Sequence, residues 1–314
     1  GQKPGQGPNL SAAANRAGNV LVPVRSRLVP GTPGNRVVSN TGVFVSDEGH
    51  VLTSLLAVAG AQEIRVGASG EKTAPAEVCG IDQKWGLAVL KTNIEHPDPI
   101  ALCGEDCKPG DWVLLAGLAG EGETGAEMVL QASVVSSTNA NTKLNGQKRD
   151  GLMRLENQVP REVSLAPVLN TQGEVTGVVI GARTVGRGRQ CFYVLPAKTL
   201  GPAVDRMKKG DNRRLGWLGM VVAYRKGMEG LTIKGVLKDS PSYRAGLRPG
   251  DLLLQIEGES IQTPAVFQRK VGRAEPGTTW HVKFLRNDRL RDARVELGAR
   301  PLLVSRFPVS ATML

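Results

Sequence analysis

The stretch of residues 41–60, TGVFVSDEGHVLTSLLAVAG, constrains the fold of this chain more than any other. Apolar residues alternate along residues 43–46 and 50–53, which predicts two β-strands. Gly49 lies between them and can adopt the positive φ that a tight turn requires. A short run rich in alanine and leucine follows. The stretch therefore predicts an antiparallel hairpin that leads into one helical turn.

Similar short apolar segments continue to about residue 203. Turns with glycine or asparagine separate the segments at residues 20–24, 76–78, 112–116, 128–135, 174–180 and 191–195. Strands of this length and spacing are typical of antiparallel barrels. Residues 10–18 predict a short helix ahead of the first strand. Residues 117–125 and 139–151 are polar and rich in glycine, and they predict loops.

A second region follows a charged segment near residue 208, which predicts a linker. In this region GVLKDSP, residues 235–241, is followed by AGLRPGDLL, residues 245–253. Together with the hairpin, these motifs resemble the HtrA/Deg family, which are trypsin-like serine proteases with a PDZ domain. The resemblance covers about residues 10–300 and implies that residues 264–271 form the helix beside the peptide groove.

The resemblance implies a mainly β fold, with a chymotrypsin-like double antiparallel β-barrel followed by a PDZ domain. We expect a Gly/Pro-rich tail at residues 1–9 and a trypsin-like domain at residues 10–207. A linker at residues 208–212, the PDZ domain at residues 213–300 and a C-terminal tail at residues 301–314 complete the expected organisation.

The catalytic triad of the family is degenerate in this chain. The family's histidine comes three residues after a strand-ending threonine, and counting from Thr53 gives Leu56. Gly86 stands at the position of the aspartate, and Ser164 alone matches. A serine hydroxyl needs a base that takes its proton. His50, His96 and His281 are the chain's histidines, and none is a convincing substitute.

The loop around Ser164 also departs from the family pattern. The resemblance implies an oxyanion hole built from the serine amide and the amide of a glycine two residues earlier, where this chain has Glu162. Leu165 and Ala166 replace two further glycines, so the loop must take another path or accept strain. With three parts of one mechanism missing, we expect no catalytic residues, and Ser164 is interpreted as a polar loop residue.

The second region contains the expected ligand site. The resemblance identifies residues 215–220, LGWLGM, as the loop that binds a peptide carboxylate and the start of the strand beside it. Such domains add an extended peptide to a sheet edge. We predict peptide binding by Gly216, Trp217, Leu218, Gly219, Met220, Val266 and Lys270. Gly216 and Gly219 would keep the loop open to the ligand, although the apolar members could also simply fill the core.

The C-terminal residues suggest a ligand within the chain itself. Thr312, Met313 and Leu314 place a hydroxyl two residues before an apolar terminus, a pattern that many PDZ grooves accept. A chance match in a frayed tail is the alternative. Protein C-termini or extended peptides are the expected partners, and the chain is expected to be a subunit of a protein assembly.

Four cysteines fit an oxidising compartment, and Cys103 and Cys107 are the expected disulfide. Cys79 and Cys191 could pair or stay reduced. A zinc site would need four converging ligands, so we expect no metal and no cofactor. The first residues lack the apolar core of a signal peptide, and no apolar run is long enough to span a membrane. We expect a mature, periplasmic or otherwise exported protein.

The net charge of +11 raises the question of an acidic partner. Lysine and arginine are scattered and aromatic residues make up only 4% of the chain, so a solvated basic surface is favoured over a nucleic-acid partner. The sequence thus favours an inactive HtrA-like pseudoprotease that acts as a peptide-binding scaffold or assembly subunit. The alternative is a serine endopeptidase, or a periplasmic quality-control protease or chaperone, that uses Ser164.

Overall fold

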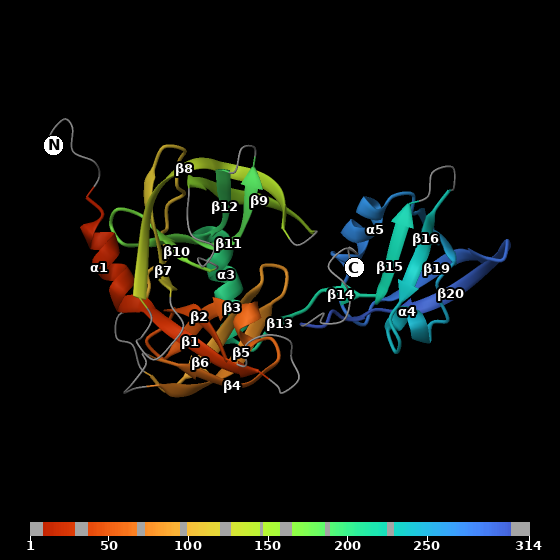
Figure 1. The fold of residues 1–314 in the computed structure, drawn as a ribbon, viewed down its shortest axis with the longest axis horizontal. Coiled ribbons are helices and arrows are strands. Elements are labelled where there is room, and N and C mark those ends of the chain that lie inside the picture. Colours follow the sequence, from red (N-terminus) through yellow and green to blue (C-terminus); the bar gives the residue numbers. More distant parts are fainter. Residues whose placement is uncertain are drawn as a thin grey trace. The chain divides into compact units, whose positions relative to one another are not determined.

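The structure is a computed structural model that describes residues 9–28, 37–67, 73–94, 99–119, 127–144, 147–157, 165–185, 189–224 and 229–302. The chain forms two compact units, one of residues 1–144 and 149–213 and the other of residues 145–148 and 214–314. Both units consist mainly of strands (Figure 1). Each is described separately.

The first unit begins with α1 (Ser11–Val20), as the sequence predicts, and continues into a seven-stranded sheet. The strand order is β13-β5-β4-β1-β2-β3-β6, and an additional pairing of β5 with β6 closes the ring. Its strands are β1 (Leu21–Leu28), β2 (Val37–Phe44), β3 (His50–Ser54), β4 (Ala61–Val66), β5 (Ala74–Asp82), β6 (Leu87–Thr92) and β13 (Asn212–Arg213). The expected hairpin is β2–β3, and the expected helical turn is α2 (Leu55–Val58).

Six further strands form a closed antiparallel barrel in the order β10-β11-β12-β9-β8-β7. They are β7 (Trp112–Ala119), β8 (Glu127–Leu144), β9 (Gln147–Asn157), β10 (Pro167–Leu169), β11 (Val175–Val185) and β12 (Arg189–Pro196). The double-barrel prediction is confirmed. The loop expected at residues 139–151 is wrong in most of its length, because β8 continues to Leu144 and β9 begins at Gln147.

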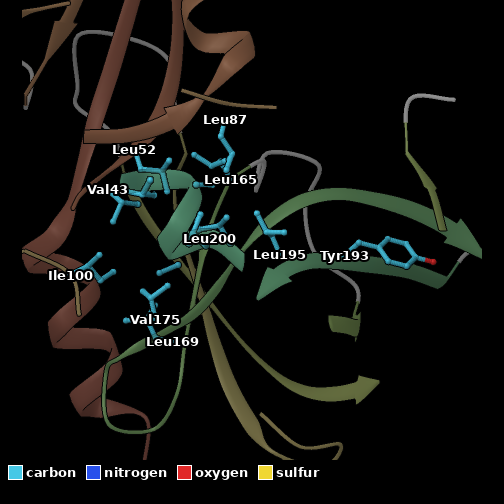
Figure 2. Close-up of a cluster of buried hydrophobic side chains, with 14 of the residues drawn as sticks. Val43, Leu52, Leu87, Ile100, Leu165, Leu169, Val175, Tyr193, Leu195 and Leu200 are labelled. Atoms are coloured by element: carbon cyan, nitrogen blue, oxygen red, sulfur yellow. The ribbon is translucent and has the colours of Figure 1, made fainter. Parts of the chain in front are cut away.

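One apolar cluster includes residues of both barrels, α1 and α3 (Ala197–Lys208). Figure 2 shows Val43, Leu52 and Leu87 of the first barrel in this cluster together with Leu195 of the second and Leu200 of α3. Helix α3 packs against β5 at Gly80, where a Cβ atom would lie only 2.4 Å from the carbonyl oxygen of Met207. The two barrels and α3 are therefore packed as one body.

The linker expected at residues 208–212 belongs to the first unit. Helix α3 ends at Lys208, and β13 pairs in parallel with β5, with Asn212 opposite Ile81 and Arg213 opposite Asp82. The charged composition of this segment indicates exposure, which both a linker and a short edge strand provide. Composition alone could not distinguish these two structures.

The second unit is a sheet in the order β15-β16-β17-β19-β20, with β18 paired to β17, and a two-stranded ribbon of β14 and β21. Its elements are β14 (Gly216–Trp217), β15 (Met220–Tyr224), β16 (Leu231–Val236), α4 (Pro241–Arg244), β17 (Leu252–Ile256), β18 (Glu259–Ser260), α5 (Pro264–Val271), β19 (Thr279–Arg286), β20 (Arg289–Glu296) and β21 (Gly298–Ala299). Phe267 of α5 is fully buried in its core. The predicted helix has the bounds of α5.

Candidate functional site

Leu56 occupies the position that the resemblance assigns to the catalytic base. It lies in α2, directly after β3, and its amide donates to Ser54 Oγ at 3.2 Å. The residue is 69% exposed, so it adds little to the core. An aliphatic side chain cannot accept a proton, and its exposure gives no packing reason for a leucine here.

Gly86 lies beside this position and ends the turn between β5 and β6. Its amide donates to Asp82 O at 2.9 Å, and its carbonyl accepts from the amide of Leu55 at 2.8 Å. The fold therefore brings the two degenerate triad positions together, as the resemblance implies. Gly86 has a φ of +73°, and a Cβ atom added there would meet nothing within 4 Å. A side chain would have room but would be in a conformation that glycine prefers.

Ser164 and Glu162 lie outside the described residues, but Leu165 shows how the loop continues. Leu165 belongs to the main core, where Figure 2 shows its side chain. It is 2% exposed and has a φ of +63°. Its amide donates to Val179 O at 3.0 Å, and Val179 N donates to Ala166 O at 2.9 Å. Leu165 thus has a left-handed conformation at a position where the family has glycine. Of the two outcomes expected from the sequence, strain is the one realised at Leu165.

His50 is not placed to replace the missing base. It is buried, its Nδ1 lies 2.7 Å from Ser46 Oγ, and Glu48 Oε2 lies 3.7 Å from the same nitrogen. Burial lowers the pKa of His50, and Lys91 and Lys208 lower it further. His50 is the first residue of β3 and Leu56 lies beyond the other end of that strand, and five strand residues extend about 13 Å.

The other two histidines offer no observed base either. His96 lies outside the described residues. His281 is on β19 of the second unit, and its amide donates to a carboxylate oxygen of Glu257.

The expected Cys103–Cys107 disulfide is not formed in the structure. The Cys103 thiol accepts from Asn170 Nδ2 at 3.6 Å, whereas Cys107 packs against the second-barrel core. Burial raises the pKa of both thiols, and of the Cys79 thiol as well. Short sequence spacing therefore does not imply pairing here, since the two side chains have separate partners. Within the described residues no group of three or more histidine, cysteine or acidic side chains could hold a metal ion.

The turn ahead of Gly86 contains a feature that the sequence interpretation missed. Trp85 lies under the ammonium of Lys84, at 4.5 Å from the ring centroid, and under the guanidinium of Arg149, at 5.5 Å. Burial lowers the pKa of Lys84, and nearby Arg213 and Arg149 add to that effect. These cations come from β5–β6, β9 and β13, so no window of the sequence shows them as a cluster.

The loop predicted to bind a peptide carboxylate lies between β14 and β15, at the edge of the second sheet. Gly219 has a φ of +72°, and a Cβ atom there would lie 2.3 Å from Ser240 Cβ. At Gly216 a Cβ atom would lie 2.8 Å from Ala274 O. Both glycines are therefore required by the packing of the unit itself. That they also leave room for a ligand stays a prediction.

The apolar members of this predicted site belong to the core. Leu218 and Met220 are 0% and 1% exposed and lie in the same cluster as Phe267. Val266 is partly buried against that cluster, and Lys270 Nζ forms an ion pair with Glu259 Oε2 at 2.6 Å. Helix α5 contacts β15, so the edge strand and the helix have the arrangement that peptide addition needs. Contact of these side chains with a peptide stays a prediction.

These observations define a class: a trypsin-like unit with degenerate triad positions, followed by a PDZ domain. Residues 40–178 match the family model of the trypsin-like peptidase domain, and residues 179–297 match that of the PDZ domain. The range that matches the PDZ model begins within β11 of the first unit, so the compact second unit corresponds to the C-terminal part of that matched range. The chain belongs to the HtrA/Deg family.

Two curated relatives are named "Probable periplasmic serine endoprotease DegP-like". The protein of Halomonas elongata is 27% identical over 87% of this chain, and that of Marinomonas sp. is 29% identical over 87%. The chain spans 59% of the length of either relative.

Solved structures support the fold. The HtrA-type protease AlgW with a decapeptide has a TM-score of 0.59 at 22% identity, covering 93% of this chain and 99% of that one. The serine endoprotease from Yersinia pestis has a TM-score of 0.59 at 22% identity, covering 95% of this chain and 100% of that one. No helix within the described residues is long and apolar enough to cross a membrane.

Proposed function

We propose that this chain is a catalytically inactive HtrA-like pseudoprotease that binds peptides through its PDZ domain. The observation that carries the proposal is the pair Leu56 and Gly86. Both lie where the family has its base and the group that orients it, and they are neighbours through the bond from Leu55 N to Gly86 O. Neither residue can accept or orient a proton.

The size of the expected fall in kcat supports the proposal that the chain is inactive as a protease. Removal of a single triad base lowers kcat of a serine protease by about 10⁶. Here the orienting acid is absent as well, and the adjacent loop contains a left-handed, buried Leu165 in place of glycine. The described histidine nearest in sequence, His50, is engaged with Ser46.

Peptide binding is the function that the second unit retains. Edge strand β15 and helix α5 flank a position where an extended peptide can pair with the sheet, and the loop that precedes β15 has an unstrained glycine at its turn. Relatives of known structure include HtrA-type proteases with a bound decapeptide and tripeptide. The proposed ligands are protein C-termini or extended segments, and the proposed role is that of a scaffold or assembly subunit in the periplasm.

A second candidate is a serine endopeptidase, or a quality-control protease or chaperone, that uses Ser164. The names of the curated relatives favour this candidate. It requires a base that the described residues do not provide near Leu56.

Two measurements on the full chain separate these functions. Fluorescence anisotropy with labelled peptides that have free C-termini is expected to give saturable binding, which is lost with amidated controls. Incubation with casein is expected to give no cleavage above that of the Ser164→Ala variant. Cleavage that depends on Ser164 would favour the endopeptidase, and absence of any peptide binding up to about 1 mM would contradict the scaffold. The proposed docking of the chain's own Thr312, Met313 and Leu314, which lie outside the described residues, predicts that a peptide of this tail competes.

A further inference from the structure

We propose that the degenerate triad face of the first unit is a docking surface for polypeptide segments that combine acidic and aliphatic side chains. This inference rests on the proposed loss of catalysis, because it gives the face another use. It concerns a surface separate from the PDZ groove, so the two kinds of binding can be tested independently.

The first element of the surface is a cationic cluster built around Trp85. Lys84 and Arg149 both approach its ring, at 4.5 and 5.5 Å from the centroid, and the Arg149 guanidinium also donates to Lys84 O. A cation over an indole ring gains free energy from the ring quadrupole, so Trp85 helps to hold two like charges together. Long cationic side chains that are already positioned lose less entropy when they bind an anion.

Arg213 adds a third cation at the same place. It lies in β13, opposite Asp82 of β5, and its carbonyl accepts from Gln83 N at 2.9 Å. The lowered pKa of Lys84, caused by burial and then by Arg213 and Arg149, agrees with this proximity. An anion between these groups would relieve their mutual repulsion.

Two carboxylates next to the cluster contact a fourth cation. Asp82 is only 1% exposed, and its Oδ2 lies 3.3 Å from Arg206 Nη2. Asp211 Oδ2 lies 3.3 Å from Nε of the same arginine. These two acids therefore pair with Arg206 in the first place.

An exposed aliphatic side chain borders this cluster. The bond from Leu55 N to Gly86 O places Leu56 beside the turn that carries Lys84 and Trp85. Leu56 is 69% exposed in a position where the fold would accept a polar residue. A basic cluster next to an exposed leucine complements a segment in which glutamate or aspartate alternates with leucine-like residues.

The arrangement favours polypeptide over nucleic acid. Proteins that bind single-stranded nucleic acid offer free aromatic faces for base stacking. The Trp85 ring is already covered by the cations of this chain, and carboxylates match its guanidinium and ammonium groups without any stacking. An acidic peptide segment is thus the partner that the surface fits.

The test uses the full chain and a fluorescein-labelled peptide of about ten residues that alternates glutamate with leucine. The peptide is blocked at its C-terminus by amidation, so it cannot use the carboxylate loop of the PDZ domain. We expect saturable anisotropy that weakens as salt rises. The variant K84Q/R149Q is expected to raise the Kd about fivefold or more, since two exposed ion pairs are lost. A peptide that alternates glutamate with serine should bind more weakly, and this difference should vanish in L56S.

The matched control is R27Q/K198Q, which removes the same number of charges from exposed pairs elsewhere in the unit, with Glu63 and Asp106. It is expected to leave the Kd unchanged. Equal weakening in both double variants would overturn the proposal, since attraction would then come from net charge alone. Absence of saturable binding would also overturn it, as would tighter binding of an oligonucleotide of equal charge. Should K84Q/R149Q fail to show a folded circular dichroism spectrum, R213Q replaces it and is expected to raise the Kd at least twofold.

Discussion

The left-handed leucine in the degenerate loop permits a sharp prediction about stability. Leu165 has a φ of +63° and is 2% exposed. Left-handed backbone costs a residue with a Cβ atom about 1–2 kcal/mol, whereas glycine adopts it without steric cost. Truncation of a buried leucine to alanine costs about 2–5 kcal/mol. The two contributions oppose each other in a substitution by glycine.

Leu165→Ala removes the packing and keeps the strain, so we expect it to lower the free energy of unfolding by about 2–5 kcal/mol. Leu165→Gly removes both, and we expect it to be more stable than Leu165→Ala by about 1 kcal/mol. At a position with ordinary backbone the order would be reversed, because glycine loses more entropy on folding.

Urea unfolding of the full chain measures this difference. Replacement of Trp217 and Trp280 by phenylalanine leaves Trp85 and Trp112, so the fluorescence then reports on the first unit. The variants are compared in this background. A Leu165→Ala variant at least as stable as Leu165→Gly would refute the account of strain at this position.

Three further predictions follow from the site and its surroundings. The double variant L56H/G86D should not cleave casein faster than the parent, because Gly86 has a φ of +73°, which an aspartate would adopt with strain, and because the oxyanion loop is altered. Loss of one oxyanion donor alone lowers kcat by about 10²- to 10³-fold. Robust casein cleavage by the double variant would contradict this prediction. Burial lowers the pKa of His50 in the folded chain, so the neutral imidazole stabilises the fold above the unfolded pKa of 6.5. This stability should be lost as the pH falls below 6.5. Below that pH, the melting temperature of the parent should therefore depend on pH more than that of His50→Gln. Asp251→Asn should destabilise the second unit by about 2–3 kcal/mol, because the buried carboxylate accepts two hydrogen bonds of 2.7 Å from the partly exposed Arg286. An unchanged urea midpoint of that unit would refute this prediction.

The sequence predicted the elements that depend on local pattern. The hairpin of β2 and β3 and helix α1 follow from short local patterns, helix α5 follows from the family resemblance, and the structure confirms all three. Leu56 and Gly86 were also found from the sequence, because their positions are counted from motifs that the hairpin and β6 preserve. Such inferences need no knowledge of distant contacts.

Features that depend on distant contacts were missed or misinterpreted. Cys103 and Cys107 are close in the chain, yet the side-chain partners of Cys103 include Asn170, far away in sequence. The expected linker at residues 208–212 leads into β13, whose backbone pairs with β5 across more than a hundred residues. The cations around Trp85 come together in the same way. The glycines of the PDZ loop were expected to leave room for a ligand, whereas the atoms that a side chain there would meet belong to Ser240 and Ala274.

The central claim is that the triad face no longer activates Ser164. Its most direct test is treatment of the full chain with a fluorophosphonate, followed by intact-mass spectrometry beside the Ser164→Ala variant. An unactivated serine hydroxyl is a weak nucleophile at neutral pH, so the account predicts no adduct on either protein under conditions that label an active serine protease completely. A stoichiometric adduct on the parent chain that is lost in Ser164→Ala would contradict it.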